Sequence, residues 1–150
     1  MKSAHLIVVG KLKDKHLEAL EDDYLKRIKN PKLIIHEVKA AAEDKEAEAK
    51  NVLKKVESIC ENSFLIILTE FGDEFHSPQF SKWIYKHIDK GMELIFVICG
   101  AEGPSQSLLD ASNAKLSLSK LTYPHKLARL IFVEQFYRAM TINDGHPYHN

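Results

Sequence analysis

The chain has 150 residues, of which 45% are hydrophobic and 28% charged, and its formal net charge is zero. This composition excludes a disordered chain and a uniformly basic nucleic-acid-binding protein, and it is typical of one globular domain over residues 1–150. The apolar runs are too short for a membrane span or a signal peptide, and two cysteines are too few for a disulfide framework. We therefore expect a cytoplasmic protein with reduced thiols and no contact with a membrane.

Apolar runs typical of buried strands alternate along the chain with segments of helical periodicity. The predicted strands are residues 4–9, 33–38, 64–69, 93–99 and 115–118. The predicted helices are residues 14–29, 40–61, 77–90, 105–111 and 126–142, and a polar tail follows them. Strands that are apolar on both faces and joined by helices are typical of parallel sheets. The sequence therefore predicts an α/β domain, a parallel sheet with helices on both faces.

Several predicted strands end in glycines and hydroxyl-bearing residues, at Gly10, 69–72, 99–103 and 118–125. In open parallel sheets, ligands bind outside the carboxyl ends of the strands, so we expect the functional site there. The chain has no glycine-rich dinucleotide motif, no P-loop, no zinc-ligand spacing and no Gly-x-Ser-x-Gly motif. These absences disfavour an ordinary dehydrogenase, an NTPase or a serine hydrolase, and we expect no metal.

Two of these strand ends carry the most polar groups. The turn Gly100–Pro104 contains two glycines, which let the backbone approach a ligand closely, although a tight turn without a ligand has the same pattern. The segment Leu118–His125 offers backbone amides, hydroxyls, an aromatic ring and an imidazole. An ordinary strand-to-helix connection is the alternative for that segment.

The predicted last helix, residues 126–142, is apolar on nearly every face. Such a helix is buried on more than one side, either at a subunit interface or inside its own chain. Arg129 and Arg138 then need partners in a buried setting, and either acidic side chains or phosphate would serve.

Positive charge is concentrated in the last quarter of the chain. Residues 1–112 have a net charge of −3, and residues 113–150 have a net charge of +3. A polyanionic partner would therefore bind mainly the C-terminal quarter. The candidate cations are Lys120, Lys126, Arg129 and Arg138, and Lys11, Lys13 and Lys15 extend the patch unless they are plain solubility groups.

The tail Gly145–Asn150 contains two histidines and a tyrosine. Such groups are typical of residues that stack on a base or close over a ligand. A frayed terminus is the alternative.

Four motifs in their order resemble one family: Gly100–Gly103 after a strand, then Leu118–His125, Glu134–Ala139 and His146–His149. Together they resemble the ribosomal RNA large subunit methyltransferase H family, the small SPOUT-class pseudouridine N3-methyltransferases, over the whole chain. The resemblance implies a C-terminal trefoil knot, S-adenosylmethionine as the methyl donor, and a homodimer. It also implies a pseudouridine in 23S rRNA, within the assembled ribosome, as the substrate.

The resemblance further implies which residues contact the methyl donor. These residues are Leu68, Thr69, Cys99, Gly100, Gly103, Leu118, Ser119, Lys120, Leu121, Thr122 and Tyr123. Cys99 stands where the family has the first glycine of a pair, and Thr69 stands where a leucine is usual. Because the Cys99 side chain must fit beside the donor, this position is a test of the expected pocket.

Methyl transfer from an activated donor needs alignment of donor and acceptor and removal of the acceptor's proton. We expect His125, Arg138 or His149 to help the N3 atom lose its proton, with some of these groups supplied across the dimer. Arg138 has two alternative roles, binding phosphate or holding the interface. Two rival functions stay open: a non-enzymatic nucleotide-binding or ribosome-associated module, and a SPOUT methyltransferase acting on tRNA.

Overall fold

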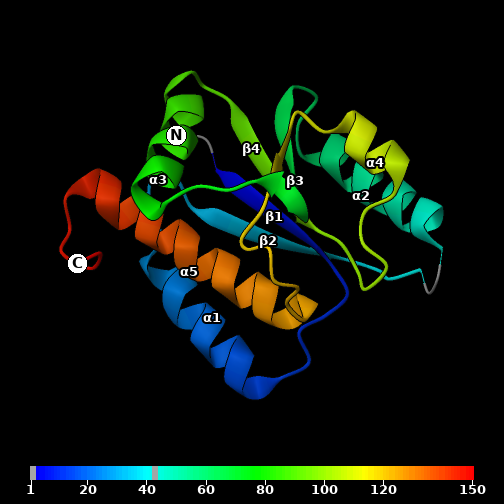
Figure 1. Cartoon of the computed structure of the whole chain (residues 1–150), viewed down its shortest axis with the longest axis horizontal. Helices are drawn as coiled ribbons and strands as arrows, with labels where there is room; N and C mark the ends of the chain where they lie inside the picture. The colour runs from blue at the N-terminus through cyan, green and yellow to red at the C-terminus, as the bar shows by residue number, and fades with distance from the viewer. Residues whose placement is uncertain (1–2, 42–43) are drawn as a thin grey trace.

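The computed structural model describes residues 3–41 and 44–150. Its strands form one sheet in the order β2-β1-β4-β3-β5, in which all neighbouring strands are parallel (Figure 1). The strands are β1 (Ala4–Val9), β2 (Leu33–Val38), β3 (Ser63–Asp73), β4 (Glu93–Ile98) and β5 (Ala114–Leu116). The predicted parallel α/β sheet is confirmed.

Helices cover both faces of this sheet (Figure 1). They are α1 (Lys15–Arg27), α2 (Lys45–Ile59), α3 (Ser77–Asp89), α4 (Gln106–Ala111) and α5 (His125–Asp144). Helices α1, α3 and α5 pack on one face, and α2 and α4 pack on the other. Within the described ranges, no helix combines the length and apolarity that crossing a bilayer requires.

Alternation along the strands builds a separate core on each face. In β4, Phe96 and Ile98 belong to the core under α5, whereas Ile95 and Val97 belong to the core under α2. All four side chains are buried. This explains the unbroken apolar runs, because a strand covered on both faces has no polar side.

Capping residues define the ends of several helices. Asp14 caps α1 by accepting hydrogen bonds from the amides of His16 and Leu17, and Ser105 caps α4 through the Leu108 amide. At the other end of the chain, Gly145 stops α5 with a left-handed φ of 72°.

Two predicted boundaries differ from the structure by four or more residues, and the others by one or two at most. The helix predicted over residues 40–61 begins only at Lys45, where Asp44 caps it, and residues 42–43 lie outside the described residues. The strand predicted to end at Thr69 continues to Asp73, because β3 pairs with β5 a second time after a shift in register. The predictions missed this because Glu70, Gly72 and Asp73 are not typical strand residues.

Helix α5 is largely buried within its own chain. It lies between α1 and α3, and the rings of Phe132 and Phe136 lie 4.7 and 6.2 Å from the ring of Phe96 in the sheet. The intrachain alternative therefore accounts for most of the helix's apolar residues. The exceptions include Leu127, which is 43% exposed.

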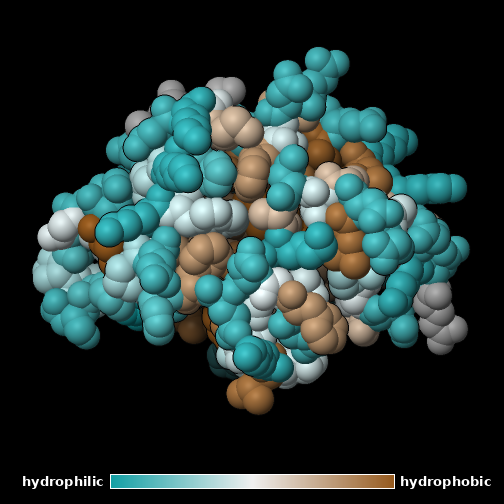
Figure 2. All heavy atoms as spheres, turned by 45° about the horizontal axis from the view of Figure 1, so that its top comes forward, coloured by the Kyte–Doolittle hydropathy of each residue, from teal (hydrophilic) through white to brown (hydrophobic). Residues whose placement is uncertain are grey.

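The outer surface is mainly polar. Figure 2 shows hydrophilic residues over most of the visible face, with apolar side chains of the described residues in small groups between them. The largest exposed apolar side chain is Phe71, which is 89% exposed and follows Glu70 at the carboxyl end of the sheet.

Candidate active site

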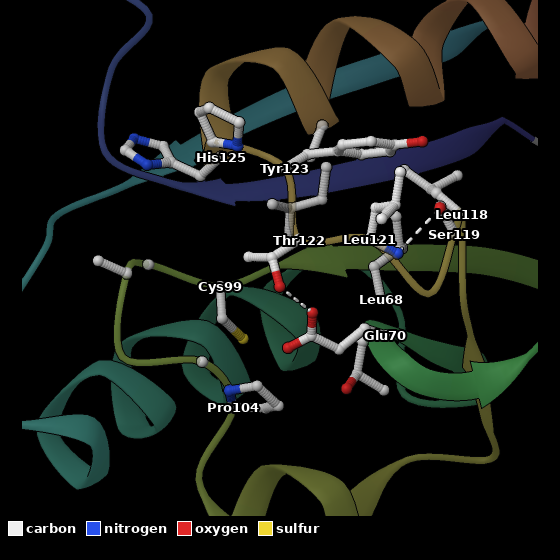
Figure 3. A pocket seen from close by; sticks show the side chains of 17 residues that line it. Leu68, Glu70, Cys99, Pro104, Leu118, Ser119, Leu121, Thr122, Tyr123 and His125 are labelled. Atoms are coloured by element: carbon white, nitrogen blue, oxygen red, sulfur yellow. Dashed lines mark hydrogen bonds between the residues drawn. The ribbon is translucent and has the colours of Figure 1, made fainter.

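A cavity of about 530 Å³ lies at the carboxyl ends of β3, β4 and β5 (Figure 3). This volume is in the range of small-molecule sites in proteins. Of the residues predicted to contact a methyl donor, ten line the cavity: Leu68, Thr69, Cys99, Gly100, Gly103, Leu118, Ser119, Leu121, Thr122 and Tyr123. His125 also lines it. The structure thus brings together three segments that lie far apart in the sequence.

Lys120 is the predicted contact that does not line this cavity. Its ammonium lies 3.8 Å from the carboxylate of Glu74, and its side chain is almost fully exposed. The reason is local geometry: Leu121 and Ser119 face the cavity, and the intervening lysine faces a neighbouring hollow beside Phe71.

Several lining residues are absent from the list of predicted donor contacts, although most of them lie in the strand-end segments where the site was expected. They are Glu70, Ile98, Ala101, Pro104, Pro124 and Ala128. Glu70 is the chemically important one, because it carries a carboxylate. A signal for it existed, since it directly follows the predicted strand 64–69 at the edge where parallel sheets bind ligands.

A hydrogen bond joins two walls of the cavity. The Thr122 hydroxyl, from the segment after β5, donates to the Glu70 carboxylate on β3 (Figure 3). On the same segment, the Leu121 amide donates to the Ser119 hydroxyl at 3.0 Å. These bonds hold the loop between β5 and α5 in a defined shape.

The turn after β4 is closed by hydrogen bonds of its own. The Gly103 amide donates to the Gly100 carbonyl at 3.0 Å, and Gly103 has a left-handed φ of 76°. The Gly100 amide donates to Glu48 Oε1 on α2 at 3.2 Å. A Cβ at Gly100 would lie 2.9 Å from that oxygen, so a larger residue here would require the Glu48 side chain to move.

Cys99 fits into this wall. Its side chain is 9% exposed and packs in the core under α2 and α4 while also lining the cavity. Burial, and then the negative charge of Glu48, raise the pKa of the Cys99 thiol to about 12. The thiol is therefore protonated at neutral pH and is no nucleophile.

Arg129 is bound to carboxylates. Its guanidinium donates to both oxygens of Glu21 on α1, at 2.7 and 2.9 Å, and to Glu37 on β2 at 2.7 Å. Burial alone would lower the pKa of Arg129, but the bonds to the two carboxylates outweigh it and the pKa lies above its ordinary value. The predicted partner of Arg129 was either an acidic side chain or phosphate, and the structure shows acidic side chains. The prediction that Arg129 belongs to an exposed basic patch is wrong, because its guanidinium is buried and bound to two carboxylates.

The other two predicted catalytic residues lie far from His125. Arg138 is thirteen residues further along α5, which is about 20 Å along the helix axis. It donates to Glu134 at 2.9 and 3.1 Å and lies 2.8 Å from His149 Nδ1. One chain by itself therefore does not bring His125, Arg138 and His149 together.

The C-terminal tail folds back on α5, so it is not a frayed end. The His146 amide donates to the Thr141 carbonyl at 2.9 Å, and the Tyr148 ring lies under the Arg138 guanidinium, 4.9 Å from it. The Tyr148 hydroxyl donates to Glu134 at 3.1 Å. Burial, with the Tyr24 hydroxyl and the Glu134 carboxylate, raises the pKa of Tyr148 above its ordinary value.

The lysines near the N-terminus lie at the same end of the sheet as the cavity. Lys11, Lys13 and Lys15 are exposed, and Lys11 borders a small hollow together with His125 and Lys126. In the part of the chain that the structure describes, no three His, Cys, Asp or Glu side chains are placed to hold a metal ion.

Residues 1–149 match a family model described as "Predicted SPOUT methyltransferase". The chain belongs to the SPOUT methyltransferase family. This membership makes it an enzyme and sets aside the non-enzymatic alternative.

Curated relatives match this SPOUT chain over nearly its whole length. Proteins named "Ribosomal RNA large subunit methyltransferase H" are 36% identical in Bacteroides fragilis, with 97% of each chain covered, and 40% identical in Prochlorococcus marinus. The latter match covers 96% of this chain and 93% of the relative. The protein of that name in Enterococcus faecalis is 40% identical, with 96% and 97% covered. The family resemblance drawn from the motifs is confirmed.

Proposed function

We propose that this SPOUT enzyme uses S-adenosylmethionine to methylate N3 of a pseudouridine in 23S rRNA on the assembled ribosome, in the cytoplasm. The observation that carries the proposal is the cavity of about 530 Å³, which gathers ten of the eleven predicted donor contacts and places His125 beside them. The names of the relatives support a large-subunit rRNA substrate.

The cavity fits S-adenosylmethionine in size and chemistry. Its walls combine apolar side chains such as Leu68 and Leu121 with backbone groups of the turn after β4 and the loop after β5. This mixture suits a ligand with an adenine ring and a polar chain. When bound, S-adenosylmethionine supplies an activated methyl group, so the protein needs no nucleophile, in keeping with the buried, protonated Cys99.

We infer that His125 handles the acceptor proton. It is exposed at the first turn of α5 and lines the cavity, so an incoming base can reach it. Arg138 and His149 would join it only from a second subunit, because they lie about 20 Å away along α5. A homodimer through the outer face of α5, where Leu127 and Ile131 are partly exposed, would supply them.

We also propose the trefoil knot that the family resemblance implies. The tight packing of β3 around β5 supports it: a Cβ at Gly72 would lie 2.7 Å from backbone atoms of Lys115 and Leu116. Immediately afterwards, the Ser117 amide donates to the Asp73 carbonyl at 2.9 Å. The two segments thus lie against each other at backbone distance where their register shifts.

The test is methyl transfer from radiolabelled S-adenosylmethionine to intact ribosomes, free rRNA and tRNA, with the labelled nucleotide mapped. We expect ribosome-dependent label at N3 of one pseudouridine. If only tRNA were labelled, the protein would still be a methyltransferase, but its substrate would be tRNA and not rRNA. No transfer to any RNA, together with no binding of S-adenosylmethionine in calorimetry, would overturn the proposal.

A matched pair of variants tests His125. We expect His125→Ala to lower the rate of transfer at saturating ribosomes by at least about tenfold, the lower range for loss of an acid–base group. His76→Ala, which changes an exposed histidine on the α3 N-cap, is the control and should leave the rate unchanged. Equal rates and equal ribosome binding in both variants would remove His125 from the mechanism.

A further inference from the structure

The lining of the cavity is poor in charged side chains. Among the described residues that line it, Glu70 carries the one carboxylate, and none is a lysine or an arginine. Its other titratable side chains are the Cys99 thiol, the Tyr123 phenol and the His125 imidazole. The thiol is neutral at physiological pH because burial raises the pKa of Cys99 to about 12.

Glu70 is held in place at the cavity wall. It follows β3 residues Leu68 and Thr69, and its carboxylate accepts the hydrogen bond from Thr122 across the cavity (Figure 3). Gly72, two residues further on, is pressed against the β5 backbone and fixes the same stretch of β3. The carboxylate therefore has a hydrogen-bonded position on this wall, while its side chain remains exposed to solvent.

The N-terminus of helix α5 also contributes to the electrostatic field inside the cavity. The helix begins at His125 on the cavity wall, and a helix N-terminus carries a positive partial charge. That charge by itself disfavours a cationic ligand. A carboxylate on the opposite wall restores an attractive field for a positive charge inside the cavity.

We propose that Glu70 makes the cavity selective for the charge of the methyl donor, so that the cationic donor binds more tightly than its neutral product. This inference rests on the proposed use of S-adenosylmethionine. In the transfer, the carbon–sulfur bond breaks and its electron pair stays on sulfur. The methyl group bonds to N3, and the N3 proton passes to the proposed base, His125. The sulfonium cation thereby becomes the neutral thioether of S-adenosylhomocysteine.

Two consequences follow for turnover. The product loses its attraction to Glu70 at the moment of reaction, which favours exchange of product for fresh donor. Because Glu70 stabilises the donor's charge before the reaction and that charge fades in the transition state, it improves donor binding without raising the rate of the chemical step. Glu70 is thus a specificity residue, distinct from the proton-handling role proposed for His125.

The experiment is calorimetric binding of three ligands to the wild type and to Glu70→Gln. The ligands are S-adenosylmethionine, S-adenosylhomocysteine, and sinefungin, in which a protonated amine replaces the sulfonium. Because Glu70 is exposed, we expect a modest effect: about three- to fivefold weaker binding of the two cationic ligands, with S-adenosylhomocysteine unchanged. Glu74→Gln is the matched control, since Glu74 is exposed nearby but does not line the cavity.

The wild type gives a second readout that does not depend on any variant. Salt screens exposed charges, so raising the ionic strength should reduce the preference of the wild type for S-adenosylmethionine over S-adenosylhomocysteine. In Glu70→Gln this preference is already smaller, and it should change little with ionic strength. Steady-state kinetics should show a raised KM for the donor and no loss of kcat.

Equal weakening of all three ligands by Glu70→Gln, or no weakening, would overturn the inference, as would an equal effect of Glu74→Gln. If the folded wild type binds none of the three, the proposed function itself is overturned and the charge inference with it. The two failures are therefore distinguishable.

Discussion

The two ends of α5 are built for different purposes. At its first turn, His125 is exposed and lines an open cavity. Near its last turn, Arg138 and Tyr148 both bind Glu134, and His149 binds Arg138. Polar groups beside an open cavity are available to a ligand, whereas groups that satisfy one another stabilise the chain. A catalytic role for Arg138 or His149 would therefore require their hydrogen bonds within the chain to be replaced by bonds to the substrate.

The largest effect should come from Arg129, which ties the cavity end of α5 to α1 and β2. We expect Arg129→Ala to destabilise the fold by about 3–5 kcal/mol, because Glu21 loses its ion-pair partner while buried. Chemical denaturation measures this loss. A change below about 1 kcal/mol would show that the three-way ion pair contributes little.

Stability should depend nearly as strongly on the close packing of β3 against β5 at Gly72. In Gly72→Ala the new methyl group would lie 2.7 Å from the backbone of Lys115 and Leu116, so the strands must separate. We expect about 1–3 kcal/mol of destabilisation, the usual cost of overpacking. The matched control is Gly145→Ala at the other end of α5, where nothing lies within 4 Å of the added carbon and only the left-handed φ is strained.

The basic surface beside the cavity can be tested separately from the cavity. We expect the triple change of Lys11, Lys13 and Lys15 to Glu to weaken ribosome binding by at least about tenfold, with a shallower salt dependence. Affinity for S-adenosylmethionine should not change, because none of the three lines the cavity. Unchanged ribosome binding, measured by co-sedimentation at two salt concentrations, would assign these lysines to solubility alone.

A change among the residues that bind the C-terminal tail should lower the stability of the fold without affecting the cavity. Glu134→Gln keeps the size of the side chain but removes the charge that binds Arg138, so we expect a loss of about 1 kcal/mol and faster proteolysis of the tail. Donor affinity measured by calorimetry should match that of the wild type. A weaker donor affinity would link the two ends of α5.

The smallest effect at neutral pH belongs to Cys99. Burial raises its pKa from the usual 9 to about 12, so the unfolded chain releases this proton before the folded chain does. The resulting stabilisation is complete below pH 9 and declines as the pH rises toward 12. Cys99→Ala should therefore flatten the loss of stability above pH 9. At pH 8, iodoacetamide should label Cys60 and spare Cys99; equal labelling would contradict its burial.

The pattern of the sequence was enough to predict the layers and the location of the site. The runs around Ile7, Ile66 and Ile95 are short, apolar on successive residues and rich in β-branched side chains, which is typical of a strand covered on both faces. Once the strands are parallel, their carboxyl ends lie at one edge, so the segments around Cys99 and Leu118 lie at the same edge.

The sequence alone thus determined the parallel sheet and the edge at which the cavity lies, because these follow from periodicity and chain direction. The family resemblance, and not periodicity, implied most of the residues that line the cavity. Only the tertiary structure decided which partner Arg129 has, that Glu70 reaches across to Thr122, and that one chain keeps His125 and Arg138 apart. The physical reason is that each of these depends on side chains brought together from distant elements. Arg129 and Glu21 are 108 residues apart, and no local pattern records that they meet.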